Sequence, residues 1–186
     1  AIDLYGALYD GKSDVAYATK MPVSSASEAQ AKGDEALGRG DLDLALFEYI
    51  RALRQEGDDA EVLYKIGIIH EGRGNDRLAE LAFRWALRAE PQHAGALAGL
   101  GILLMNRREY GEAKAKLTAA VASDRRMPRA HNALGVLADI QRNYAEAQRH
   151  YEEALGLTEE SPVILNNLGY SRYLSGNRKG AVAAFQ

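Results

Sequence analysis

The sequence has no cysteine and little proline, and both absences narrow the classes of structure that it can form. Without cysteine among the 186 residues, disulfide frameworks and thiolate metal sites are excluded. Hydrophobic residues make up 47% of the chain and charged residues 26%, which is the composition of a folded protein and not of a disordered one. No apolar run approaches the roughly 20 residues of a membrane-spanning helix, so no transmembrane segment is predicted.

The chain also has no excess of positive charge. Lysine and arginine number 23 against 26 aspartates and glutamates, which gives a net charge of −3. Nucleic-acid binders usually need a basic surface to neutralise phosphates, so a nucleic-acid partner is not predicted. The opening residues, AIDLYGALYDGK, lack the basic region and continuous apolar stretch of a signal peptide. They also lack an initiator methionine, and we therefore expect the chain to be a mature or trimmed product.

What is present in quantity is a 34-residue repeat. Five glycines are spaced by 34 residues each: Gly33, Gly67, Gly101, Gly135 and Gly169. Twelve residues after each glycine stands an alanine: Ala45, Ala79, Ala113, Ala147 and Ala181. Four further on the residue is large and apolar: Tyr49, Phe83, Leu117, Tyr151 and Phe185. Self-similarity at this period is the signature of a repeat architecture.

The residue types at these positions have a physical reason. Two antiparallel helices approach closely only where both present small side chains, and the glycine and the alanine supply that contact. The large residue fills the space where the helices diverge. A single helical hairpin cannot bury its apolar face alone, so successive hairpins must stack.

A helix-turn-helix of 34 residues with this pattern resembles the tetratricopeptide repeat, and the segment from Leu63 to Pro91 matches it best. The resemblance implies an all-α, right-handed superhelical solenoid over residues 26–186. Its repeats would span 26–59, 60–93, 94–127 and 128–161, with a partial repeat at 162–186. The family's tryptophan near the start of the first helix is missing, which leaves the fold prediction intact.

The two ends fall outside this regularity. Ser25 and Glu28 can form a capping box at the first helix. Residues 1–25 hold several aromatic and aliphatic side chains, and we expect this N-terminal extension to pack on the array; a trimmed linker is the alternative. At Gln186 the last repeat stops in mid-helix, so we expect the native chain to continue. Alternatively the open apolar end pairs with a second copy, and either end could therefore produce a homo-oligomer.

Catalytic and cofactor signatures are absent from the sequence. The four histidines, His70, His93, His131 and His150, form no HExxH motif and no pair of ligands on one helix, so no metal site is predicted. Neither a phosphate-binding GxxxxGK[ST] loop nor a GxSxG elbow occurs. We therefore predict a protein that is not an enzyme and that needs no cofactor.

The resemblance also implies a binding surface, because positions 2, 5, 9 and 12 of each tetratricopeptide repeat line its concave groove. The groove residues chosen on this basis are Glu61, Tyr64, Ile68, Glu71, Ala98, Ile102, Met105, Arg129, Asn132, Val136, Asp139, Asn166, Tyr170 and Tyr173. They are mainly apolar and aromatic, and the two asparagines can bond a peptide backbone. We expect an apolar peptide or an amphipathic helix as the partner. The alternative is that some of these residues only pack between repeats.

One biological setting can be suggested from the repeats themselves. Segments such as GDLDLALFEYIRAL and NNLGYSRYLSGN are similar to the repeat lipoproteins of bacterial tight-adherence (Flp) pilus systems, the TadD-like proteins. That likeness implies a scaffold in pilus or secretion assembly, a pilus or secretin component as partner, and a periplasmic location anchored to the outer membrane. The alternatives are a cytoplasmic adaptor or co-chaperone, and a non-catalytic module of a larger protein.

Overall fold

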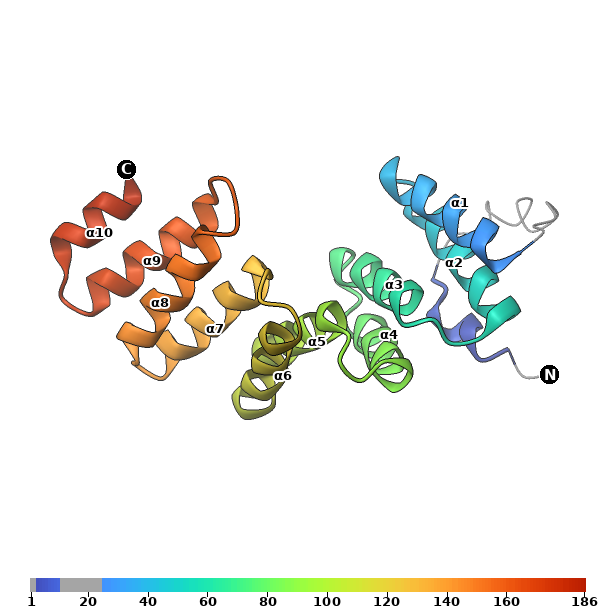
Figure 1. The fold of residues 1–186 in the computed structure, drawn as a ribbon, viewed down its shortest axis with the longest axis horizontal. Coiled ribbons are helices and arrows are strands. Elements are labelled where there is room, and N and C mark those ends of the chain that lie inside the picture. Colours follow the sequence, from blue (N-terminus) through green and yellow to red (C-terminus); the bar gives the residue numbers. More distant parts are fainter. Residues whose placement is uncertain (1–2, 11–24) are drawn as a thin grey trace. The chain divides into compact units, whose positions relative to one another are not determined.

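The computed structural model describes residues 3–10 and 25–186, and within these residues it is entirely helical (Figure 1). A short 3₁₀ helix, η1, spans Tyr5–Leu8. The α-helices in chain order are α1 (Ala26–Gly38), α2 (Leu42–Glu56), α3 (Ala60–Gly72), α4 (Asp76–Ala89), α5 (Ala94–Asn106), α6 (Tyr110–Ser123), α7 (Pro128–Ile140), α8 (Tyr144–Leu155), α9 (Pro162–Leu174) and α10 (Arg178–Phe185). Each predicted repeat therefore holds two helices joined by a short turn.

The helices pack as consecutive pairs within two compact units, Ala1–Gly99 (unit 1) and Leu100–Gln186 (unit 2). In unit 1, α1 packs on α2 and α3 on α4, while α2 joins the two pairs through α3. In unit 2, α7 packs on α8 and α9 on α10, and α8 also contacts α9. The division falls inside α5. This succession of helical hairpins confirms the predicted all-α tetratricopeptide fold.

The repeated glycines make room for the large residue of the same hairpin. A Cβ atom on Gly67 would lie 2.6 Å from Cδ1 of Phe83, and one on Gly135 would lie 2.7 Å from Cδ1 of Tyr151. Carbon atoms pack at about 3.5–4.0 Å, so a side chain there would collide with the ring. The bulky residue that lies on each of these glycines is therefore the main reason for the glycine. The contact with the alanine, which was expected from the sequence, is less important.

The turn inside each hairpin requires a left-handed residue at one fixed position. The residues there, again 34 apart, are Gly40, Gly74, Arg108, Arg142 and Gly176, all with φ between 60° and 85°. Glycine adopts this conformation freely, whereas another L-residue pays about 1–2 kcal/mol. The side chain of the residue before several helices caps the first turn; Ser25, for example, accepts a bond of 3.1 Å from the Glu28 amide. That bond is half of the predicted capping box.

Residues 3–10 lie against unit 1. Leu8 is fully buried, and its carbonyl accepts a 2.6 Å bond from Nε2 of His70. The ring of Tyr5 packs edge-on against Trp85 with the centroids 6.1 Å apart. Asp3 pairs with Arg54. The other residues of the predicted extension, 1–2 and 11–24, lie outside the described residues, so its boundaries stay a prediction.

Candidate functional site

The predicted groove residues of unit 1 are mostly half-buried. Tyr64 is half-buried: its ring lies 5.1 Å from that of His93, and a Cβ on Gly95 would be 2.7 Å from its Cζ. Ile68 and Glu71 are also half-buried, and Glu61 is exposed. Ala98 is only 2% exposed, so it offers almost no surface to a partner.

The predicted residues of unit 2 are more accessible. Arg129, Asn166, Tyr170 and Tyr173 are exposed, and the remaining five are half-buried: Ile102, Met105, Asn132, Val136 and Asp139. Tyr170 has 58% of its surface exposed, which is unusual for a large ring whose hydroxyl is its only polar group. An apolar surface of this kind marks a contact site when several such residues adjoin one another.

They do adjoin one another in a hollow of about 320 Å³ between α7 and α9. We call it the α7/α9 hollow; its lining residues are Val136, Asp139, Ile140, Tyr151, Asn167, Tyr170 and Leu174. Helical periodicity accounts for the lining, because residues three, four and seven apart share one helix face. Three of the predicted groove residues, Val136, Asp139 and Tyr170, are thus brought together, while Asn166 and Tyr173 do not line this hollow.

The floor of the hollow is a fixed hydrogen-bond network. Asp139 accepts a 2.8 Å bond from the Tyr151 hydroxyl and a 2.6 Å bond from the Ser171 hydroxyl, one on each carboxylate oxygen. Burial and the neighbouring Asp139 carboxylate raise the pKa of Tyr151 above its ordinary 10.0. Asp139 therefore joins α7, α8 and α9, and its role in the hollow is to position these helices.

Asn167 is a lining residue that the sequence analysis missed. Its Nδ2 donates a 3.0 Å bond to Oδ1 of Asn132. That bond leaves the Asn132 amide nitrogen and the Asn167 carbonyl oxygen as the atoms that a peptide backbone could engage. The spacing of Asn167, Tyr170 and Leu174 along one helix face was the signal that could have found it, whereas the repeat position taken from the family selected Asn166.

Comparison with known proteins agrees with this architecture. A family model described as the tetratricopeptide repeat matches residues 31–94, 99–162 and 140–186, which is most of the chain. The chain belongs to the tetratricopeptide-repeat family. No curated protein sequence matches it.

Several solved tetratricopeptide-repeat structures share the fold. A MamA fragment from Desulfovibrio magneticus RS-1, running from residue 41 to its end, is 26% identical with a TM-score of 0.72, covering 88% of this chain and 92% of its own. Pseudomonas aeruginosa PilF is 19% identical with a TM-score of 0.75, covering 87% and 73%. PilW, a widely conserved type IV pilus biogenesis factor, is 20% identical with a TM-score of 0.70, covering 86% and 74%.

Membership of the tetratricopeptide-repeat family makes this chain a protein-interaction scaffold, since stacked repeats of this kind present extended surfaces to other proteins. Among the described residues, none of the helices combines the length and the apolar character required to span a membrane.

Proposed function

We propose that this tetratricopeptide-repeat protein holds an apolar peptide or amphipathic helix of a partner protein in the α7/α9 hollow. The observation that carries the proposal is the clustering of Tyr170, Ile140 and Leu174, all exposed, around one cavity. A helix in a groove binds through apolar side chains three, four and seven residues apart, and a cavity of this size accepts one or two of them.

The polar lining adds orientation to this apolar contact. Asn167 lines the hollow and is bonded to Asn132, so the pair offers an amide N–H donor on Asn132 and a carbonyl acceptor on Asn167, which matches the backbone of a peptide. Asp139 already accepts bonds from Tyr151 and Ser171, so the proposal does not require it to contact the partner. A partner with large apolar side chains and few charges fits this lining best.

The setting that we propose is the assembly of a bacterial pilus or secretion apparatus, with a pilus or secretin component as the partner and the protein held in the periplasm. Support comes from the similarity of the repeat segments to tight-adherence pilus lipoproteins. PilF and PilW have the same fold, and at 19% and 20% identity their likeness supports the fold alone. A cytoplasmic location of the full-length protein in fractionated cells would contradict this setting and leave the α7/α9 hollow untouched.

Selection from a library of random displayed peptides tests the hollow. We expect the peptides that bind the wild-type chain to carry large apolar residues at helical spacing, and their binding to fall at least about a hundredfold with Tyr170→Glu, since a buried unpaired charge costs several kcal/mol. The matched control is Val182→Glu, because Val182 is 57% exposed on α10 and does not line the hollow. Equal binding to the Tyr170→Glu and Val182→Glu variants would refute the proposal.

A further inference from the structure

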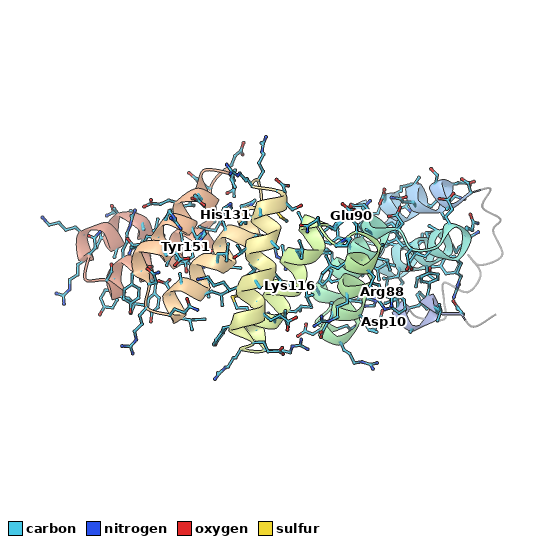
Figure 2. The ribbon with its side chains drawn as sticks, turned by 60° about the horizontal axis from the view of Figure 1, so that its bottom comes forward. Asp10, Arg88, Glu90, Lys116, His131 and Tyr151 are labelled. Carbon is cyan, nitrogen blue, oxygen red and sulfur yellow. The ribbon has the colours of Figure 1, made fainter. Side chains whose placement is uncertain are left out.

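A second cluster of side chains lies in unit 2 away from the α7/α9 hollow. His131 is in the first turn of α7 (Figure 2), and His150 and Glu153 are three residues apart on α8. One ligating atom from each of the three side chains lies within 4.8 Å of the others. The sequence could not show this set, because it draws on two helices and only one of its histidines shares a helix with the carboxylate.

His131 occupies a position that is apolar in every other repeat. The equivalent residues are Ala29, Leu63, Leu97 and Leu165. His131 is nevertheless buried at 8% exposed. A buried polar ring costs free energy unless both nitrogens find partners, so packing alone does not account for a histidine here.

Its hydrogen bonding fixes which nitrogen carries the proton. Nε2 lies 3.1 Å from the Arg125 carbonyl oxygen, which can only accept, so Nε2 is the donor. In the neutral ring Nδ1 is then a bare lone pair. It lies 3.0 Å from Oε2 of Glu153, which is also an acceptor, and it has no hydrogen-bond partner among the described residues.

His150 approaches the same carboxylate from the other helix. Its Nδ1 is buried, has no hydrogen-bond partner within the described part of the chain, and lies 3.8 Å from the same Oε2 of Glu153. A carboxylate oxygen that faces two imidazole nitrogens attracts a cation, which is either a proton on a ring nitrogen or a metal ion bound by all three groups. Three ligands of a tetrahedral zinc ion, each about 2.0–2.1 Å from the metal, lie about 3.3 Å apart. The two nitrogen–oxygen separations are 3.0 and 3.8 Å, and the three ligand atoms all lie within 4.8 Å of one another.

From this geometry we infer that His131, His150 and Glu153 form a binding site for a divalent transition-metal ion of the zinc type. Two imidazoles and one carboxylate are a donor set that zinc accepts, with further positions left for water or another ligand. The Arg125 carbonyl holds His131 in the required tautomer, as second-shell carbonyls do for metal-binding histidines. A cavity of about 600 Å³ lined by His131, Glu153 and Arg125, among others, gives the ion access from solvent.

Titration of the untagged chain with Zn²⁺ alone, in competition with a chromophoric chelator, tests the site. We expect one zinc ion per chain, a rise in the thermal midpoint on zinc addition, and visible absorption of four-coordinate cobalt when Co²⁺ replaces it. Glu153→Gln and His150→Gln should each weaken zinc binding by more than about tenfold, since loss of a ligand exceeds the loss of a second-shell partner. Glu153 is exposed, so its variant should keep the wild-type far-ultraviolet circular dichroism.

The matched control is His93→Gln. His93 faces Glu61 in unit 1 with Nε2 and Oε2 3.0 Å apart, which is a histidine–glutamate pair outside the cluster that binds the ion. Its variant should bind zinc as the wild type does. The inference is overturned by an absence of zinc binding to the wild type at about 100-fold molar excess of metal over chain, which would make His131 and Glu153 a plain ion pair. It is equally overturned by zinc binding that survives both Glu153→Gln and His150→Gln, which would mean an adventitious ion only.

Discussion

The two units differ in how their predicted groove residues are packed. In unit 1, Tyr64 is half-buried and packs over Gly95 and against the His93 ring. In unit 2, Asn132 stands where Tyr64 does, and Val163 replaces Gly95. Asn132 is half-buried as well, and Tyr170 is exposed beside the α7/α9 hollow. The large exposed apolar side chains that line the α7/α9 hollow, Ile140, Tyr170 and Leu174, therefore all belong to unit 2.

A second difference concerns what stabilises each unit. Unit 1 has glycine at both of its left-handed turn positions, Gly40 and Gly74, and is covered in part by residues 3–10. Unit 2 has Arg108 and Arg142 at two of its turns and no such covering segment among the described residues. The two strained turns therefore lie in the unit that carries the hollow.

The largest expected effect on stability comes from weakening the packing of residues 3–10 against unit 1. Leu8→Ala should destabilise unit 1 by about 3 kcal/mol, because it deletes a fully buried leucine. The single tryptophan of the chain, Trp85, lies in unit 1, so denaturant unfolding followed by its fluorescence reports on that unit. Leu4→Ala, at a well-exposed leucine, is the control and should leave the midpoint unchanged. Equal midpoints for both variants would show that residues 3–10 do not stabilise unit 1.

A smaller effect separates two glycines of unit 1. Gly67→Ala should cost about 2 kcal/mol, because the added Cβ meets the fully buried ring of Phe83, which has no room to move. Gly95→Ala meets Tyr64, which is only half-buried and can swing outward, so the cost should stay below about 0.5 kcal/mol. Both changes in the free energy of unfolding are measured from the unfolding transition of unit 1, followed by Trp85 fluorescence. Equal losses of stability in the two variants would mean that Tyr64 is as firmly packed as Phe83.

The buried tyrosine under the hollow gives a pH-dependent prediction. The raised pKa of Tyr151 favours folding below pH 10.0, and this contribution is lost as the pH rises above that value. Tyr151→Phe should therefore destabilise unit 2 by about 1 kcal/mol near neutral pH and flatten the alkaline loss of stability. Urea unfolding followed by circular dichroism at about pH 8 and about pH 11 measures both. An unchanged alkaline slope would show that another group is responsible.

The smallest effect concerns the turns. Arg142→Gly should stabilise unit 2 by about 0.5 kcal/mol, since relief of the left-handed strain exceeds the entropy that glycine adds to the unfolded chain. The reverse change in unit 1, Gly74→Ala, should destabilise by about 1 kcal/mol. Amide hydrogen exchange resolves the two units separately. The free energy of unfolding should rise with Arg142→Gly and fall with Gly74→Ala. A loss of stability in both variants would show that Arg142 is not strained in its turn.

The sequence predicted the helical hairpins and their register, because these follow from a 34-residue pattern that recurs along the chain, but it paired each repeated glycine with an alanine and not with the bulky residue that lies on it. Three of the groove residues that it selected, Val136, Asp139 and Tyr170, line one hollow. It did not select Asn167, because a family position identifies a single residue, whereas the lining of the hollow depends on a whole helix face. The packing of Tyr64 over Gly95 and the meeting of His131 with His150 and Glu153 depend on contacts between helices. No pattern along a single helix encodes such contacts.

The most direct test of the central claim is a methyl nuclear-magnetic-resonance titration of the wild-type chain with a selected apolar peptide. If the peptide binds in the α7/α9 hollow, the shifted methyl groups will be those of Val136, Ile140 and Leu174, with Val182 unaffected. Shifts centred on Val182, or on Ile68 in unit 1, with the hollow unchanged, would contradict it.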